Sequence, residues 1–344
     1  MAITPNNIGA FITLVDTRVG QVWLDLDVDE TEGMWVTDDP MTDGGSQKTY
    51  AWTGMMPKPR PWFGSRVLYE PAPQTYTVIP IPYELTYTID QFKLDDSDPN
   101  TMSYFWRMLP DMARQWRRQK CYEVRDLLEN SGVQTGSRQN GWDGLTFFNT
   151  AHPIDFYNPG FNPGGMFTAG TYCNDFTGGG VSVGGVTVGG ALSVLSYSSL
   201  LQYAGQIPGE DGEVLGVNLN YMMVPGTLKD VGMFILKSSS IAPPTYGNWS
   251  ASSTQVGAVS NMWAQMGVDL IVNKFLKSTT KFYMGDNRPS FRGVIWVVRE
   301  AARTIPRVMP NDPIVFDSHR YAWGGWDRVT PAWGPSFLML RSGS

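Results

Sequence analysis

The chain has 344 residues and a formal net charge of −6, with 42% hydrophobic and 17% charged residues. This length and composition are enough to bury a sizeable core, which indicates one elaborated or two modest globular domains. No apolar run approaches the roughly 20 residues that cross a bilayer, and residues 1–16 lack the basic start and long apolar core of a signal peptide. We therefore expect a protein that is made in a cytoplasm and does not contact a membrane.

The negative charge is concentrated near the start of the chain. Residues 1–45 contain nine acidic residues and one basic residue, Arg18, so the rest of the chain carries a net charge of +2. Apolar and acidic residues alternate within this segment: Leu24, Asp25, Leu26, Asp27, Val28 and Asp29. A period of two predicts a half-buried strand with its acids on one face. Residues 1–49 are predicted to form an extended arm whose acids are solvated or lie on a basic surface elsewhere.

Residues 50–90 are rich in proline and aromatic side chains. The prolines are Pro57, Pro59, Pro61, Pro71, Pro73, Pro80 and Pro82. Prolines at this density exclude a helix or a central strand, so the segment is predicted to be an edge hairpin or a projecting loop. Its exposed Trp and Tyr residues gain stability only where something covers them, which favours contact with another subunit. An ordinary surface loop folded over its own core is the alternative.

The clearest predicted helix covers residues 98–131. Asp98 suits the N-cap, Pro99 suits the first helical position, and the Asn130-Ser131-Gly132 sequence suits the end. Its apolar residues recur at helical spacing, and about 30 residues at 1.5 Å each give a rod of roughly 45 Å. This rod is predicted to be the spine of one domain.

The second half of the chain alternates between helical and strand patterns. Residues 158–190 are glycine-rich without a phosphate-binding motif, 191–206 and 227–236 read as helices, and 238–261 reads as a long exposed loop. Residues 220–225, 268–272, 281–285, 293–298 and much of 312–340 read as strands. The predicted fold class is therefore α+β, with helices in the middle and strands towards both ends.

Residues that could carry catalysis or bind a metal are scarce. His319 follows Asp317 and Ser318, but neighbours in sequence point apart, and no nucleophile elbow is present. His152 stands in a turn-like Asn-Thr-Ala-His-Pro stretch, where a hydrogen-bonded structural histidine is the better interpretation. Cys121 and Cys173 lie far in sequence from both histidines and are expected to stay thiols. The arm has Asp-x-Asp-x-Asp spacing but no calcium-loop glycine. We predict no catalytic residue, no metal site and no cofactor.

Two stretches resemble the major head subunits of Mu-like phages. The first reads YAWTGMMPKPRPWFGSR, and its matching positions are Tyr50, Trp52, Gly54, Pro57, Arg60, Trp62, Gly64 and Arg66. The second, from Trp142 to Pro153, reads WDGLTFFNTAHP, with Trp142 where that family has tyrosine and Asn149 where it has aspartate. The order of elements also resembles the family over most of the chain, more weakly over 155–215 and 240–262.

The resemblance implies the HK97-like capsid fold, an α+β fold with an N-terminal arm, an extended loop, a peripheral domain with a long spine helix, and an axial α/β domain. On this sequence the implied parts are the arm, 1–49; the loop with flanking strands, 50–90; the peripheral domain, 91–189, with spine 98–131 and a glycine-rich insertion; the axial domain, 190–285; and strands returning to the peripheral domain, 286–344.

The function implied by the resemblance is that of the major capsid protein of a tailed bacteriophage. Copies would self-assemble in the host cytoplasm into the icosahedral head of the virion, which encloses double-stranded DNA. The implied partners are further copies in hexamers and pentamers, other head proteins such as portal, scaffold or cement protein, and packaged DNA through non-specific contacts. The alternatives are another virion subunit, such as tail tube or sheath, and a cytoplasmic hydrolase.

Three groups of residues are predicted at contacts between subunits. They are Tyr50, Trp52, Arg60, Trp62 and Arg66 in the loop, Arg114, Arg117, Arg118 and Lys120 on the spine helix, and Asp25, Asp27 and Asp29 in the arm. The spine group forms a basic stretch that fits either the acidic arm, on the same or a neighbouring subunit, or DNA phosphates. Residues 101–130 have a net charge of +2, which is modest for a phosphate-binding surface and favours the arm.

Overall fold

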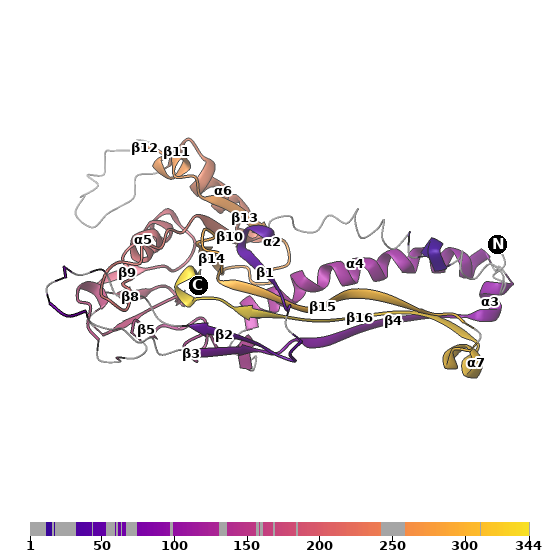
Figure 1. Cartoon of the computed structure of the whole chain (residues 1–344). Helices are drawn as coiled ribbons and strands as arrows, with labels where there is room; N and C mark the ends of the chain where they lie inside the picture. Colours follow the sequence, from indigo (N-terminus) through magenta and orange to yellow (C-terminus); the bar gives the residue numbers. More distant parts are fainter. Residues whose placement is uncertain are drawn as a thin grey trace.

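The fold consists of two sheets with helices packed on them (Figure 1). The structure, a computed structural model, describes residues 12–15, 17, 32–42, 44–52, 59, 61–62, 64–66, 74–96, 99–130, 136–155, 158, 161–167, 169–183, 185–241, 259–309 and 311–343.

The first sheet has four strands in the order β1, β15, β16, β4. β1 (Val36–Pro40) runs parallel to β15 (Val294–Arg307), and β16 (Arg320–Trp333) runs antiparallel to both β15 and β4 (Ile81–Asp90). The helix α4 (Pro99–Asn130) lies along this sheet and forms the long half of the molecule with it (Figure 1). α4 begins at the predicted proline and ends at the predicted asparagine, because both ends are set by local backbone chemistry.

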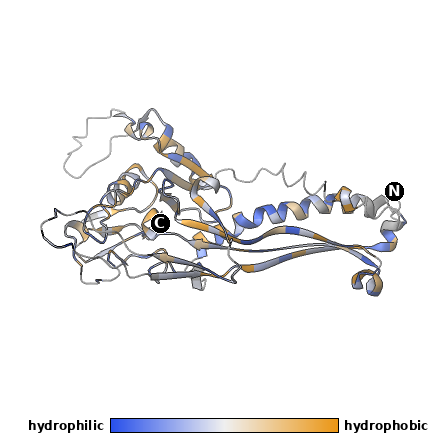
Figure 2. Ribbon diagram, in the orientation of Figure 1, coloured by the Kyte–Doolittle hydropathy of each residue, from blue (hydrophilic) through white to orange (hydrophobic). Residues whose placement is uncertain are grey.

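The packing of α4 on the sheet depends on small residues in β16. A Cβ atom on Gly325 would lie 3.0 Å from the carbonyl oxygen of Arg303 and 3.2 Å from Nε1 of Trp116. Glycine therefore lets the helix approach closely at this point. The sheet-facing side of α4 is apolar, with Phe105, Trp116 and Val124 buried. Figure 2 shows hydrophilic residues along much of the rest of this helix. No described helix is long and apolar enough to cross a membrane.

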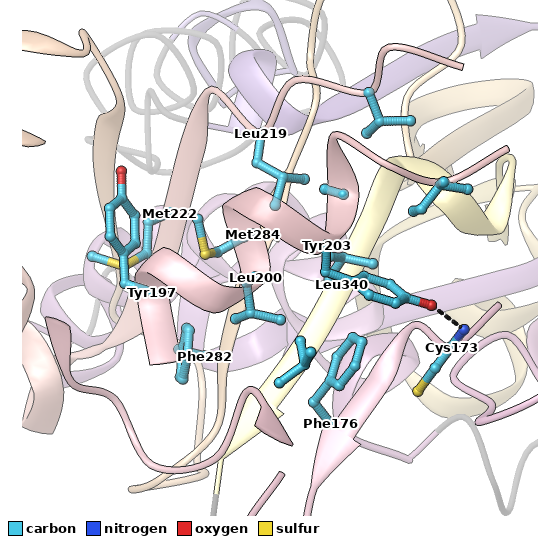
Figure 3. Packing of buried hydrophobic residues seen from close by; sticks show 14 of the residues in the cluster. Cys173, Phe176, Tyr197, Leu200, Tyr203, Leu219, Met222, Phe282, Met284 and Leu340 are labelled. Atoms are coloured by element: carbon cyan, nitrogen blue, oxygen red, sulfur yellow. Dashed lines mark hydrogen bonds between the residues drawn. The ribbon is translucent and has the colours of Figure 1, made fainter. Parts of the chain in front are cut away.

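The second sheet has five strands in the order β13, β10, β14, β17, β7. They are β13 (Asp269–Asn273), β10 (Tyr221–Pro225), β14 (Phe282–Gly285), β17 (Met339–Gly343) and β7 (Asp175–Thr177). α5 (Val194–Ala204) and α6 (Lys229–Lys237) contribute to a hydrophobic cluster with this sheet. Within that cluster Tyr203 Oη accepts a hydrogen bond of 2.6 Å from the backbone N–H of Cys173 (Figure 3). Cys121 and Cys173 are both buried thiols that form no disulfide with each other.

The remaining elements are short. β2 (Lys48–Trp52) and β3 (Gln74–Val78) form an antiparallel hairpin, as do β8 (Val181–Val183) with β9 (Val186–Val188), β11 (Ser240–Ile241) with β12 (Val259–Ser260), and β5 (His152–Pro153) with β6 (Thr171–Tyr172). The short helices are α2 (Glu32–Trp35), α3 (Gln91–Asp95) and α7 (Pro313–Ser318), with 3₁₀ turns at Gly136–Arg138, Gly165–Phe167, Gly226–Leu228, Met262–Gln265 and Ser336–Leu338.

A central hydrophobic cluster joins the two sheets to α4. Its members come from α2, α4, the 141–149 loop, the connection between β13 and β14, and strands of both sheets: Trp35, Val36, Val124, Leu127, Leu128, Phe147, Phe148, Tyr221, Met223, Ile271, Leu276, Tyr283, Val294, Trp296, Val329, Trp333 and Met339. Glu129, near the end of α4, adds a polar link. Its Oε1 accepts hydrogen bonds from the backbone N–H groups of Lys277 (2.7 Å) and Ser278 (2.6 Å), in the connection between β13 and β14.

Two predicted segments lie differently from the expected domain plan. The glycine-rich segment, expected in the peripheral domain, supplies β7 to the five-stranded sheet, where Phe176 is fully buried. Of the strands in 286–344, β15 and β16 lie in the long sheet with β4, whereas β17 pairs with β14 in the five-stranded sheet. The end of the chain therefore does not return to the peripheral sheet, because Met339 and Leu340 are buried in the clusters around the other sheet.

We predict that Trp333 is the most sensitive position of the central cluster. Its side chain is fully buried, stacks on Phe147 with ring centroids 3.8 Å apart, and donates from Nε1 to the carbonyl oxygen of Arg138 (3.1 Å). Trp333→Ala should lower the free energy of unfolding by about 3–5 kcal/mol in urea titrations of the soluble subunit. Phe316→Ala, at a side chain 77% exposed, should change it by less than about 0.5 kcal/mol. Equal losses in the two variants would contradict this assignment.

Candidate assembly surfaces

The structure describes most, but not all, of the predicted contact residues. Tyr50, Trp62, Arg66, Arg114, Arg117, Arg118 and Lys120 are described with their side chains. Trp52 ends β2, but its side chain lies outside the described part, as do Arg60, Asp25, Asp27 and Asp29.

Tyr50 packs inside its own subunit at the base of the hairpin. Its ring lies 5.5 Å from that of Trp142 and 6.2 Å from that of Tyr76, and its residue is 7% exposed. Its hydroxyl donates to Asp39 Oδ2 (2.5 Å), and burial together with this carboxylate raises the pKa of Tyr50. This differs from the predicted contact with another subunit: the alternation of β2 turns Tyr50 towards the body of the protein. Tyr50 therefore anchors the hairpin.

The two stretches that resemble the head subunits meet at this anchor. Trp142, from the second stretch, stacks on Tyr76 at 5.6 Å and donates from Nε1 to the carbonyl oxygen of Trp333 (2.7 Å). The backbone N–H of Trp333 in turn donates to Tyr76 Oη (3.1 Å). The hairpin, the 141–149 loop and the end of β16 are thus tied together by aromatic packing and hydrogen bonds.

His152 contacts Asp143 and Phe147 of the same 142–153 stretch. It is fully buried, Nδ1 contacts the Asp143 carboxylate, and Nε2 donates to the carbonyl oxygen of Phe147 (2.9 Å). Asn174 supports the same turn: its Oδ1 accepts from the backbone N–H of Asn149 (2.8 Å) and its Nδ2 donates to Phe147 (2.7 Å). The hydrogen-bonded structural interpretation of His152 therefore fits the geometry, and the buried polar groups of the turn are paired.

Trp62 and Arg66 lie in the segment that joins β2 to β3. Trp62 is 68% exposed, its Nε1 donates to the carbonyl oxygen of Gly64 (2.6 Å), and the Arg66 guanidinium lies 5.2 Å from its ring centroid. An exposed tryptophan covered on one side by an arginine presents a large apolar surface with a fixed positive charge beside it. These two residues have the character of a contact surface, which Tyr50 lacks.

The basic stretch of α4 is divided between two faces. Lys120 points to the sheet side, where Nζ pairs with Asp38 Oδ1 at 2.6 Å and lies 6.0 Å from the Trp296 ring. Arg114 and Arg118 point outwards and are exposed, and Arg114 also pairs with Asp111 at 2.6 Å. Arg107 and Arg125 share this outward face. They are not among the predicted contact residues, although their helical spacing from Arg114 and Arg118 places them on the same face.

A group of carboxyls lies between α4 and the sheet. Asp327 of β16 is 5% exposed and accepts a hydrogen bond from Gln119 Nε2 (3.4 Å). Burial raises the pKa of Asp327 to about 6, the Gln119 hydrogen bond opposes the shift, and the charge of Glu123 adds to it. Glu123 itself pairs with Arg138 at 2.7 Å and accepts from Tyr83 Oη at 2.9 Å. Burial and this carboxylate raise the pKa of Tyr83 to about 12.

No group of three or more His, Cys, Asp or Glu side chains in the described part of the chain is arranged to hold a metal ion. The features that stand out are an anchored hairpin, an exposed tryptophan in the segment between its two strands and a long helix with exposed arginines.

Comparison with known proteins finds a family model that matches part of the chain. Residues 40–180 match the model of the Mu-like prophage major head subunit gpT. Over this part, which is less than half of the chain, the sequence is similar to the Mu-like major head subunits. This stretch contains both motifs of the sequence, the hairpin and the whole of α4. No curated protein matches the chain.

Solved structures show the fold of this chain. A chain from the procapsid of bacteriophage JBD30 is 18% identical with a TM-score of 0.52, and the match covers 99% of this chain and 76% of that one. A chain from the capsid of Myoviridae phage XM1 is 10% identical with a TM-score of 0.50, and the match covers 93% of each. The predicted HK97-like α+β fold is thereby confirmed.

We predict that the buried Asp327 makes the stability of the protein depend on pH. A carboxyl whose pKa is about 6 when folded and about 3.9 when unfolded holds its proton longer in the folded state. The contribution of protonated Asp327 to the free energy of unfolding is therefore fully present below pH about 4 and is lost as the pH rises through about 6. Asp327→Asn removes this titration, so the free energy of unfolding of the variant, relative to wild type, should rise by about 2 kcal/mol between pH 4.5 and 7.5.

The measurement is urea unfolding of both proteins across that pH range. Other carboxyls titrate alike in wild type and variant, so their contributions cancel in the difference. Asp317→Asn, in the exposed helix α7, makes the same change of charge outside the buried group and serves as the control. The difference in free energy of unfolding between Asp327→Asn and wild type could instead be independent of pH, or could change with pH as it does for Asp317→Asn. Either result would show that Asp327 is not the titrating group.

Proposed function

We propose that copies of this head subunit form the wall of an icosahedral phage head, arranged in hexamers and pentamers around double-stranded DNA. The family and the fold support a structural role in the virion capsid. The exposed Trp62 is the observation that suggests how copies associate. An exposed tryptophan gains stability when a neighbouring subunit covers it.

The far end of the peripheral half offers a second apolar surface for neighbours. Phe92 in α3 is 58% exposed, Phe316 in α7 is 77% exposed and Met309 is 49% exposed. α3 and α7 lie together at the end of the long sheet that is farthest from the five-stranded sheet (Figure 1). An elongated subunit with apolar groups at its extremities is suited to a shell, in which each copy reaches across its neighbours and burial is shared.

The proposed shell would also contact DNA and other head proteins. DNA would meet the inner wall through non-specific contacts to phosphates, which weaken as salt rises. Portal, scaffold and cement proteins stay predictions, as does assembly in the host cytoplasm. A tail tube or sheath subunit would form stacked rings or helices in place of closed shells, so the shape of the particles separates the two structural roles.

We predict that Trp62→Ala lowers the yield of particles without affecting the isolated subunit. Loss of a large aromatic contact repeated at every subunit interface should reduce the yield about fivefold or more. The unfolding midpoint of the soluble subunit should stay unchanged, because the side chain is 68% exposed there. The yield is measured by sedimentation and the shape by negative-stain electron microscopy.

Trp62→Phe is the matched control, since it keeps an aromatic ring at the same position and should retain most of the yield. Equal yields for wild type and Trp62→Ala would remove the loop from the interface. Rings or helices in place of closed shells would overturn the proposed head assembly itself.

A further inference from the structure

Four arginines form a stripe along the outward face of α4. They are Arg107, Arg114, Arg118 and Arg125. Their spacings of seven, four and seven residues keep them within an arc of about 40° at about 100° per residue, over a length of about 27 Å. The first three are exposed, and Arg125 is half-buried beside Tyr122, with its guanidinium 5.4 Å from the ring centroid. We name this surface the arginine stripe.

Most acidic residues of the same helix are engaged by contacts outside the stripe. Glu123 pairs with Arg138 at 2.7 Å, and Asp126 lies 3.9 Å from the same guanidinium. Glu129 accepts its two backbone hydrogen bonds from the connection between β13 and β14. One acid, Asp111, stays beside the stripe and pairs with one of its arginines at 2.6 Å. The helix has six basic and four acidic residues, but its net charge of +2 hides a surface on which arginines outnumber acids by four to one.

The exposed part of the stripe is charged and polar. Among the described side chains from 107 to 121, the exposed ones are Arg107, Asp111, Arg114, Gln115, Arg117 and Arg118. Within the described part of the chain, neither Arg107 nor Arg118 forms an ion pair. Protein interfaces have an apolar centre and single-stranded nucleic acids stack on aromatic rings, so neither fits this surface. Guanidinium groups along a straight line fit a rod of phosphates, to which each can donate two hydrogen bonds.

We propose that the arginine stripe is the surface through which this chain contacts the phosphates of double-stranded DNA. A duplex carries one negative charge per about 1.7 Å of its axis, so about 16 phosphates lie along the length of the stripe. A convex helix surface reaches phosphates without reading base edges, so the contact is the same for every sequence. Because the opposite face of α4 packs on the four-stranded sheet, the stripe faces the inside of the shell and the sheet faces the outside (Figure 1). The choice of DNA as the polyanion rests on the proposed function.

Binding of a DNA duplex of about 20 base pairs to the full-length soluble subunit, followed by fluorescence anisotropy, tests the contact. At about 0.05 M salt, Arg107→Gln combined with Arg118→Gln should weaken binding about tenfold or more. The slope of log K against log salt concentration should become shallower by about 2, since each lost phosphate contact removes about 0.9. Two duplexes of unrelated sequence should bind alike.

Matched variants separate the stripe from net charge and from folding. Lys229→Gln with Lys237→Gln removes the same charge from exposed positions of α6 and should leave the salt slope unchanged. Arg107→Lys with Arg118→Lys keeps the charge and should keep most of the slope, although the two-pronged hydrogen bonding is lost. All three double variants should unfold in urea at the wild-type midpoint, because only exposed side chains are changed.

The inference fails if Arg107→Gln with Arg118→Gln keeps the wild-type slope, or if the α6 control loses as much. Poly-L-glutamate that displaces the duplex equally well, charge for charge, would assign the stripe to an acidic protein segment in place of DNA. Loss of empty shells in the Arg107→Gln/Arg118→Gln variant, where no DNA is present, would make the stripe a contact between subunits and overturn the inference. If wild type itself forms no closed shells, the proposed function fails, while the salt slopes still decide the DNA contact.

Discussion

The stacking of Trp333 on Phe147 is the contact on which the rest of the structure depends. Trp333 is the last residue of β16 in the four-stranded sheet, and Phe147 belongs to the 141–149 loop, which leads to β7 of the five-stranded sheet. Phe148 packs edge-on against the same indole at 5.4 Å and also approaches Tyr283 of the five-stranded sheet. The peripheral sheet, α4 and the five-stranded sheet therefore share one core at this point, and the aromatic area buried there is large.

This junction also explains why the second motif contains polar residues. A tight turn that places two phenylalanines under Trp333 must bury backbone groups, and unpaired buried groups are costly. Asp143, His152 and Asn174 satisfy those groups within the turn itself. On the other face of the sheet Ile295 and Val297 contact the hairpin cluster, while Val294 and Trp296 contact the central cluster. Period-two alternation thus lets one strand join the hairpin to the spine.

The sequence predicts those features that local chemistry decides. The limits of α4 follow from proline at its start and from the residues at its end, and the proline-rich segment does lie between two hairpin strands. The contacts between distant strands follow from tertiary packing: nothing local to 339–343 reveals that β17 pairs with β14 and β7. Tyr50 was expected to face a neighbour because the segment is rich in aromatic residues. Composition does not show which way a side chain points, and in β2 the side chain of Tyr50 points towards the body of the protein. Arg107 and Arg125 were within reach of a helical-spacing argument, since they share the face of Arg114 and Arg118.

The open edge of β15 carries several features that discourage pairing with another strand. β1 pairs with Val294–Val298, and no other described strand pairs with the outer edge of the rest of β15. Such an edge is a template for unwanted pairing. Here it carries Arg299, Arg303 and Arg307, contains Pro306, and has register shifts between 298 and 303 against β16. Charge, proline and bulges discourage the addition of another strand at this edge. The exposed apolar side chains lie elsewhere, at Trp62 and at Phe92 and Phe316 in α3 and α7. In the proposed shell, subunits would therefore meet through exposed apolar side chains and not through this strand edge.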